Sequence, residues 1–181
     1  MPTILTHAIA GAAIAQVLAP CSRRHEVTWI AVVCAMLPDA DSIGFRLGVH
    51  YGDLLGHRGL THSFLFAGVV AVGVAAGLWN KAKAGELLQT LVCIFMATIS
   101  HALLDACTNG GMGVALLAPF NKTRYFFPFT PIKVSPLSAE AFLTQRGVSV
   151  LASEMAWVWC PSIAVMVTAR WVRCRQTPEL T

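Results

Sequence analysis

The stretch "GHRGLTHS" at residues 56–63 places two histidines, an arginine and two hydroxyl side chains within eight positions of an otherwise apolar chain. Imidazoles bind transition metals, and a guanidinium can hold a phosphate oxygen through two parallel hydrogen bonds. His57 and His62 are five residues apart, slightly out of phase on a helix. We therefore expect His57 to precede a helix that His62 begins. Arg58 is a candidate phosphate ligand; the alternative is an interfacial arginine that meets lipid headgroups.

Two further motifs carry chemistry of the same kind. "HALLD" places His101 and Asp105 four residues apart, so both side chains point from one helix face toward a common ion. "LPDAD" places Asp39 and Asp41 directly after an apolar run, where two nearby carboxylates repel each other unless a cation lies between them. The alternative for this second motif is a solvated helix terminus.

The candidate ligands form a mixed set of nitrogen and oxygen donors without a cysteine thiolate. Such a set suits two or three divalent ions with open coordination positions, zinc or manganese, and does not suit a closed structural zinc site. Clustered metal ions lower the pKa of bound water and stabilise both oxygens of an in-line displacement at phosphorus. Asp41, Arg58 and Asp105 are the candidate catalytic residues. The candidate metal ligands are His7, Asp39, Asp41, His57, His62, His101, Asp105 and Glu154.

The composition predicts a membrane protein. The chain has 181 residues, of which 56% are hydrophobic and 12% charged, and its mean hydropathy is +0.64. A soluble domain carries about 25% charged residues. The formal net charge of +4 arises from basic residues scattered at the ends of apolar runs, with no basic stripe, and this argues against nucleic acid as a partner. The six cysteines form no CxxC pair and indicate small buried side chains without a disulfide framework.

Five apolar runs must position the candidate ligands, and they cover residues 3–19, 27–37, 63–79, 87–107 and 150–172. A spanning helix needs about 20 residues, with about 17 as a minimum. Four runs satisfy this length, whereas the second is short and could be re-entrant. We expect an all-α, polytopic membrane helix bundle with about five transmembrane helices, in which residues 1–181 form a single integral membrane domain.

Alternation of the five runs across the membrane brings all the candidate ligands to the same end of the bundle. Counting from the opposite polar ends, they lie at depths of roughly 20 to 28 Å, which is one layer slightly below one interface. The segment 108–149 is too irregular to span. We expect it to be a loop at the membrane surface. It is either an ordinary connection or a lid over the metal site with Asn109, Lys122 and Arg124 facing headgroups. Within it, residues 135–147 are expected to form a short interfacial helix.

Basic residues favour one orientation. Seven of the thirteen Lys and Arg residues lie in two short loops and the C-terminal tail. Dense basic residues in short loops mark the cytoplasmic side. The opposite side, which carries the candidate ligands, is then expected to face the periplasm.

The motifs "LPDAD", "GHRGLTHS" and "SHALLDACTNGG", followed by "LLAPF", resemble the YdjM-like family of bacterial inner-membrane metal-dependent hydrolases, some of them under LexA control. That family is grouped with zinc-dependent phospholipase C and related nucleases. The resemblance implies His7, Asp39, His57, His62, His101 and Asp105 as ligands. It also implies Asp41 as a ligand or general base, Glu154 as a further ligand, and Thr61 and Ser63 as residues that orient the ligands.

Two functions fit these residues. The first is a membrane-embedded metal-dependent hydrolase that cleaves a phosphoester in a membrane lipid or lipid-linked substrate. The alternative is a metal or ion transporter that uses the same His and Asp cluster. Transporters commonly carry paired repeats and bind at the bilayer midplane through broken helices. This chain shows no repeat, and its ligands lie at one end of unbroken runs, which favours the hydrolase.

Overall fold

The computed structural model describes residues 1–136 and 139–176, and these residues form helices joined by irregular segments. The only β-type pairings among them are two isolated bridges, Thr108 with Ile132 and Val114 with Tyr125. The all-α prediction is therefore confirmed. The helices are α1 Ile4–Leu18, α2 Arg24–Met36, α3 Phe64–Gly77, α4 Ala84–Ala106, α5 Ala139–Phe142, α6 Gln145–Glu154 and α7 Cys160–Gln176. Four further helical segments accompany them: three 3-10 helices, η1 Cys21–Arg23, η2 Leu37–Leu47 and η3 Leu60–His62, and the π-helical turn η4 Met155–Trp159.

The helix lengths differ from expectation in several places. Three segments are long and apolar enough to cross a membrane, namely Cys21–Leu47, Ala84–Ala106 and Gln145–Arg175. The second run is therefore longer than predicted, because η2 continues α2 past Pro38. The apolar helices α1 and α3 are shorter than the apolar runs that predicted them, at 15 and 14 residues. The expected interfacial helix at 135–147 is reduced to α5, and residues 137 and 138 lie outside the described residues.

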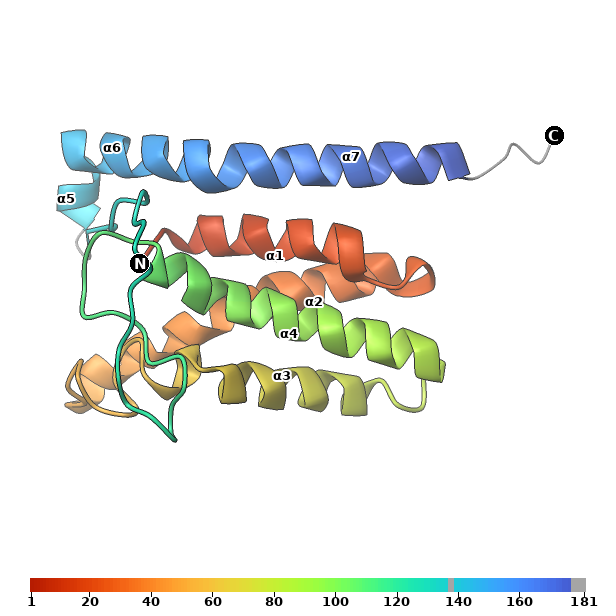
Figure 1. The fold of residues 1–181 in the computed structure, drawn as a ribbon, viewed down its shortest axis with the longest axis horizontal. Helices are drawn as coiled ribbons and strands as arrows, with labels where there is room; N and C mark the ends of the chain where they lie inside the picture. The colour runs from red at the N-terminus through yellow and green to blue at the C-terminus, as the bar shows by residue number, and fades with distance from the viewer. Residues whose placement is uncertain (137–138, 177–181) are drawn as a thin grey trace.

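The long helices run side by side along the long axis of the molecule, and the irregular segments gather at the end that holds the N-terminus (Figure 1). Helix α1 packs against α2, α4 and α7, and α4 packs against α1, α2 and α3. Helix α7 continues α6 through η4 and lies along α1. The irregular segment between α4 and α5 crosses the end of the bundle near the N-terminus.

Small side chains fill the contact between the helices. The largest buried apolar cluster contains Ala15, Ala19, Val27, Ala31, Cys34, Ala35, Ala71, Cys93, Ile94 and Ala97. In a membrane the lipid tails are as apolar as the protein core, so helix association depends on close packing between small residues. At the crossing of α1 and α2, a Cβ atom on Gly11 would lie 2.7 Å from the Cβ of Ala35. The two backbones can approach this closely only because residue 11 is glycine.

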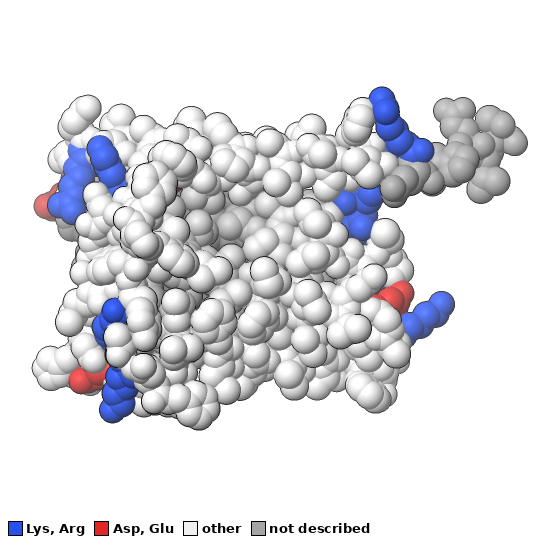
Figure 2. All heavy atoms as spheres, viewed as in Figure 1, with Lys and Arg blue, Asp and Glu red and all other residues white. Residues whose placement is uncertain are grey.

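Charged side chains occupy the two ends of the bundle and leave its middle uncharged on the face shown in Figure 2. Large apolar side chains are exposed along the helices, including Val33, Val69, Val72 and Leu88. An exposed apolar belt between two charged ends is typical of helices that contact lipid. The fold therefore agrees with a polytopic membrane protein.

Candidate metal centre

Seven of the eight predicted ligands converge at the end of the bundle near the N-terminus. Helix α1 contributes His7, η2 contributes Asp39 and Asp41, and α4 contributes His101 and Asp105. The motif at 56–63 contributes the last two: His57 lies in the turn before η3, and His62 is the last residue of η3. His57 precedes the helical segment that contains His62, as predicted, but His62 ends η3 and does not begin a helix, since α3 starts at Phe64. The expected cluster at one end of the bundle is confirmed.

The first group contains Asp39, His62, His101 and Asp105. One donor atom from each residue lies within 4.8 Å of the other three, and all four side chains are buried. Nε2 of His101 lies 3.2 Å from Oδ1 of Asp39, and Nε2 of His62 lies 3.7 Å from Oδ2 of Asp105. Two imidazole nitrogens and two carboxylates aimed at one point form a donor set suited to zinc or manganese.

The donor atoms of this group have no hydrogen-bond partner within the protein. Both carboxylate oxygens of Asp39, both of Asp105, and Nε2 of His62 and His101 are buried and make no hydrogen bond of normal geometry, although Oδ2 of Asp105 lies 2.8 Å from Nε of Arg58. A buried polar atom without a partner is costly, and native structures contain few of them. Their concentration at one point is explained if a cation binds there, so the residues fit a metal ion.

Contacts on the other ring nitrogens orient two of these histidines. Nδ1 of His101 lies 2.7 Å from the carbonyl oxygen of Ala35, which can only accept a hydrogen bond. The hydrogen is therefore on Nδ1, and the lone pair of Nε2 faces the site. Nδ1 of His62 lies 3.2 Å from Oδ2 of Asp41, and this contact directs Nε2 of His62 toward Asp39 and Asp105 in the same way.

The second group contains Asp41, His57 and His62, whose donor atoms also lie within 4.8 Å of one another. Nδ1 of His57 is 2.7 Å from Oδ1 of Asp41. The hydroxyl of Thr61 donates to Oδ2 of Asp41 at 2.7 Å, and the backbone N–H of Arg58 donates to the same oxygen at 3.2 Å. Thr61 orients a candidate ligand, as expected. Asp41 contacts two histidines through their Nδ1 atoms, which suits a residue that positions them.

His7 approaches the first group from α1. Its ring stacks on that of His101, and Nε2 lies 3.7 Å from Oδ1 of Asp105. Both ring nitrogens of His7 are buried without a hydrogen-bond partner. Its position and free nitrogens therefore suit a ligand on the α1 side of the same site.

The side chain of Arg58 is fully buried, and protein atoms surround its guanidinium group. Nε lies 2.8 Å from Oδ2 of Asp105, Nη1 donates to the carbonyl oxygen of Gly110, and Nη2 donates to the hydroxyl of Thr108. Its φ angle of 61° is in the left-handed region, which is strained for a residue with a side chain. To hold a phosphate oxygen, the guanidinium would have to release one of these contacts. Thr108 and Gly110 belong to the "SHALLDACTNGG" motif, but their contacts with Arg58 were not predicted.

The glycine and serine of the "GHRGLTHS" motif shape the turn. A Cβ atom on Gly59 would lie 2.3 Å from the carbonyl oxygen of Leu54, so no larger residue fits there without movement of the loop. Ser63 was expected to orient a ligand. It instead caps α3, because its hydroxyl accepts a hydrogen bond from the N–H of Phe66 and donates to the carbonyl oxygen of Leu60.

Glu154 is fully buried and lies outside both groups of donor atoms. Its carboxylate accepts hydrogen bonds from the N–H and hydroxyl of Thr3, both at 2.6 Å, and from the hydroxyl of Thr6 at 2.7 Å. Trp159 donates to the same Thr6 hydroxyl at 2.6 Å. Glu154 therefore joins the end of α6 to the beginning of α1, directly before the π-helical turn.

The segment that follows α4 packs over the motif at 56–63. The N–H of its Ala115 donates to the carbonyl oxygen of Arg58, and the carbonyl oxygen of its Leu116 accepts a hydrogen bond from the N–H of Phe64. Arg124 was expected to face headgroups, but it donates instead to the carbonyl oxygens of His57 and Tyr51. Burial lowers the pKa of Arg124 and raises the pKa of Tyr51. The hydrogen bonds of this segment hold it against the loop that carries His57 and His62.

Comparisons with known proteins agree with this description. Residues 1–176 match the family model described as YdjM inner membrane protein. The chain is 36% identical over 173 residues to a protein of Escherichia coli (strain K12) named inner membrane protein YbcI, and the match covers 96% of this chain and 99% of that protein. No solved structure matches. The chain therefore belongs to the YdjM family of inner membrane proteins.

Proposed function

We propose that this protein is a metal-dependent hydrolase that cleaves a phosphoester in a membrane lipid or lipid-linked substrate. The observation that carries the proposal is the cluster of buried donor atoms on Asp39, His62, His101 and Asp105, which lie within 4.8 Å of one another and make no hydrogen bond of normal geometry. Such a set suits two or three divalent ions, zinc first and manganese second. When bound, the metal would lower the pKa of water and stabilise charge on the phosphoryl oxygens.

A cleft beside the site supports a lipid as the substrate. It has a volume of about 450 Å³, and Asp39 contributes to its wall together with Met1, Ile4, Val33, Met36, Leu37, Ala40, Ser42 and Ile43. Ile4, Val33 and Ile43 are exposed at this surface. An apolar cleft that reaches a ligand residue from the lipid-facing side can hold an alkyl chain while the phosphate approaches Asp39. A water-soluble phosphoester would gain nothing from these walls.

The residues of the chain have separate roles in this proposal. Asp39 and Asp105 supply oxygen donors, and His7, His62 and His101 supply nitrogen donors. Arg58 holds Asp105 in place through their contact of 2.8 Å. Proton transfer by Asp41 or Asp105 stays a prediction, and the contacts of Asp41 with His57 and His62 favour an orienting role for Asp41.

The structure favours the hydrolase over the transporter. Below the site, toward the opposite end of the bundle, the described helices pack through the apolar cluster that includes Ala31, Cys34, Cys93, Ile94 and Ala97. A transported ion would have to pass this cluster, whereas a hydrolase needs access from one end only.

The orientation of the site belongs to the same proposal. The basic residues in the short loops favour a site that faces the periplasm. Cysteine labelling in a variant without the native cysteines tests this. We expect an impermeant reagent outside the cell to label a cysteine at Asn109 and not one at Lys81, and the reverse pattern would overturn the orientation.

Activity on defined substrates tests the function. Purified protein in nanodiscs is assayed for hydrolysis of phosphatidylglycerol, phosphatidylethanolamine and phosphatidic acid, and of water-soluble p-nitrophenyl phosphate and its bis ester. We expect turnover of a lipid phosphoester that a chelator abolishes and that zinc or manganese restores. Val33→Trp, which fills the cleft, should lower lipid hydrolysis, and Val92→Trp on an exposed surface of α4 should not. Metal-loaded protein that hydrolyses none of these lipids, or that moves the metal across proteoliposomes, would contradict the proposal.

A further inference from the structure

Residues 108–111, "TNGG" in the sequence, contain no candidate ligand but lie beside the metal centre, and we call them the TNGG turn. The turn begins two residues after the end of α4, the helix that carries two of the candidate ligands. The side-chain oxygen of Asn109 accepts a hydrogen bond from the N–H of Val134 at 3.0 Å. A Cβ atom on Gly110 would lie 2.7 Å from Cγ1 of Val134. The turn is therefore held closely against the segment that returns toward α5.

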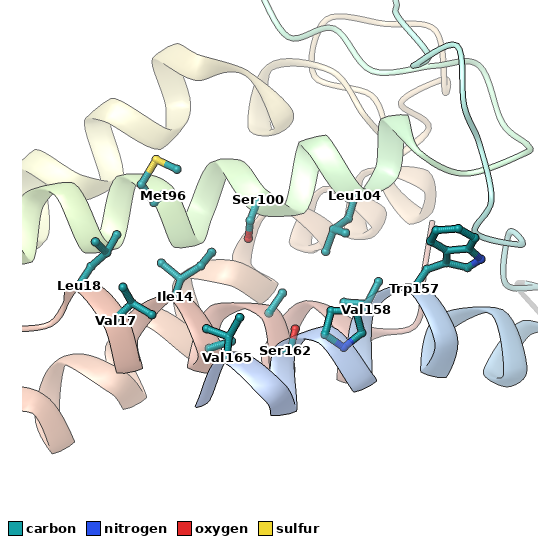
Figure 3. Close-up of a pocket in the computed structure, with 13 residues that line it drawn as sticks. Ile14, Val17, Leu18, Met96, Ser100, Leu104, Trp157, Val158, Ser162 and Val165 are labelled. Carbon is teal, nitrogen blue, oxygen red and sulfur yellow. The ribbon is translucent and has the colours of Figure 1, made fainter. Parts of the chain in front are cut away.

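The packing of α4 does not by itself fix the direction of the Asp105 carboxylate. Figure 3 shows Ser100 and Leu104, which directly precede His101 and Asp105, at the wall of an apolar cavity between α4, α1 and α7. The volume of this cavity is about 450 Å³. Open space beside these side chains means that close packing does not constrain this part of the helix. The orientation of Asp105 therefore depends on contacts from outside α4.

Arg58 supplies such a contact, since its Nε lies 2.8 Å from Oδ2 of Asp105. The other two nitrogens of the guanidinium face the TNGG turn. Nη1 donates to the carbonyl oxygen of Gly110 at 2.9 Å, and Nη2 donates to the hydroxyl of Thr108 at 3.1 Å. A planar guanidinium contacted at all three nitrogens is held in one orientation. Because both partners in the turn are neutral, they hold the group without competing for its charge.

The hydroxyl of Thr108 closes a ring of contacts around Asp105. Thr108 is fully buried, and its hydroxyl donates to the backbone carbonyl oxygen of Asp105 at 2.7 Å. The oxygen of the same hydroxyl is then free to accept from Arg58. Thr108 thus links the backbone of Asp105 to the guanidinium that contacts the side chain of Asp105.

Gly111 gives the turn its close fit to the guanidinium. Its φ angle of 93° is in the left-handed region, which favours glycine. A Cβ atom on Gly111 would lie 2.7 Å from Nη1 of Arg58 and 3.0 Å from the hydroxyl oxygen of Tyr51. Any larger residue would therefore displace the guanidinium or the turn.

We propose that Thr108, Gly110 and Gly111 are positioning residues of the metal centre. They hold Arg58 so that its guanidinium directs the carboxylate of Asp105 toward the ion. The turn supplies no ligand and acts only through Arg58. This inference rests on the metal centre of the proposed function, but not on hydrolysis. Removal of a partner that orients a ligand typically lowers metal affinity about 10- to 100-fold.

The affinity for Co²⁺ and the visible spectrum of the bound ion test the role of Thr108. The full-length protein in nanodiscs is titrated with Co²⁺, whose absorption changes with the geometry of its ligands, and chelator competition gives the affinity. Thr108→Val keeps the shape of the side chain but removes the acceptor for Arg58. We expect about 10- to 100-fold weaker binding and an altered spectrum. Thr108→Ser keeps the hydroxyl and should restore both.

Thr90→Val is the matched control for Thr108→Val. Thr90 is also a fully buried threonine, close to the other end of α4, and its hydroxyl has no hydrogen-bond partner. Its removal should change neither the affinity nor the spectrum.

Gly111→Ala tests the fit of the turn independently of Thr108. The new Cβ displaces the guanidinium of Arg58, so Co²⁺ should bind more weakly and its spectrum should change. Gly48→Ala is the matched control, because Gly48 also has a left-handed φ angle, 81°, and no atom lies within 4 Å of its Cβ position. Both variants carry a similar backbone strain, but only Gly111→Ala should affect the metal.

Four results would each overturn the proposal. They are wild-type affinity and spectrum in Thr108→Val, equal weakening in Thr108→Val and Thr108→Ser, equal effects of the two glycine variants, and a wild-type protein that binds no Co²⁺. A protein that binds Co²⁺ and responds to these substitutions but hydrolyses no lipid would contradict the proposed function and support the role of the TNGG turn.

Discussion

The imidazole rings of His7 and His101 are stacked, with ring centroids 3.6 Å apart and an angle of 14° between the planes. The two residues are on α1 and α4, and no hydrogen bond joins the rings. The stack directs Nε2 of His101 toward Asp39 and Nε2 of His7 toward Asp105. Two neighbouring nitrogens thus face two different carboxylates, an arrangement that suits adjacent metal ions.

Substitution of Asp41 tests whether this residue binds the metal or only orients the histidines that bind it. Asp41→Asn keeps the shape of the side chain but weakens its contacts with Nδ1 of His57 and His62. Loss of such an orienting partner typically lowers metal affinity about 10- to 100-fold. Chelator competition should therefore show weakened binding with the metal still present at saturation. Asp53→Asn, on an exposed carboxylate between η2 and η3, is the control, and complete loss of metal in Asp41→Asn would identify Asp41 as a ligand.

Substitution of Gly11 tests whether the packing of α1 against α2 affects the metal site. In Gly11→Ala the new Cβ would lie 2.7 Å from the Cβ of Ala35, so α2 must shift. Overpacking of this kind costs about 1–3 kcal/mol. It also moves the carbonyl oxygen of Ala35 that orients His101. We expect a lower melting temperature and weaker metal binding.

Gly68→Ala is the matched control for Gly11→Ala. No atom lies within 4 Å of a Cβ at Gly68, so this variant should melt and bind metal as the wild type does. If Gly11→Ala lowered the melting temperature but left the metal affinity unchanged, the packing of α1 against α2 would not influence the metal site.

Glu154 has a structural role in this account. Glu154→Gln replaces an oxygen that accepts hydrogen bonds from Thr3 and Thr6 with an amide group that donates. An unsatisfied buried polar group costs about 1–3 kcal/mol, so thermal unfolding should occur at a lower temperature. Metal content should stay at the wild-type level. The exposed Glu140→Gln variant is the control, and a loss of metal in Glu154→Gln would show that Glu154 is a ligand.

Substitution of Arg58 tests whether the geometry of its guanidinium or its charge alone holds Asp105 in place. Arg58→Lys keeps the charge but cannot contact Asp105, Gly110 and Thr108 together, because an ammonium lacks the planar fork of a guanidinium. We expect loss of hydrolysis and a lower melting temperature, whereas Arg46→Lys on an exposed surface should change neither. Wild-type activity in Arg58→Lys would show that only the charge is needed.

The sequence predicted the cluster because its residues lie at the ends of apolar runs. Alternation of these runs across a membrane is sufficient to bring His7, His62 and His101 to one end. The contacts of each residue were not predictable, since they depend on the packing of α1, α2 and α4. The backbone carbonyl of Ala35 carries no sequence signal, and nothing in the sequence distinguishes the buried, paired Glu154 from a ligand. Arg124 illustrates the same limit: the lid interpretation of segment 108–149 placed it against headgroups, but it donates to the loop carbonyls of Tyr51 and His57.

The metal content of purified protein tests the central claim most directly. It is measured by elemental analysis on wild-type protein and on His101→Ala, after both are shown to insert in the membrane. The substitution leaves the apolar runs intact, so insertion should be unaffected. We predict at least one zinc or manganese ion per wild-type chain and well below one in His101→Ala. Wild-type protein without a divalent transition metal, or equal metal in both proteins, would contradict the account.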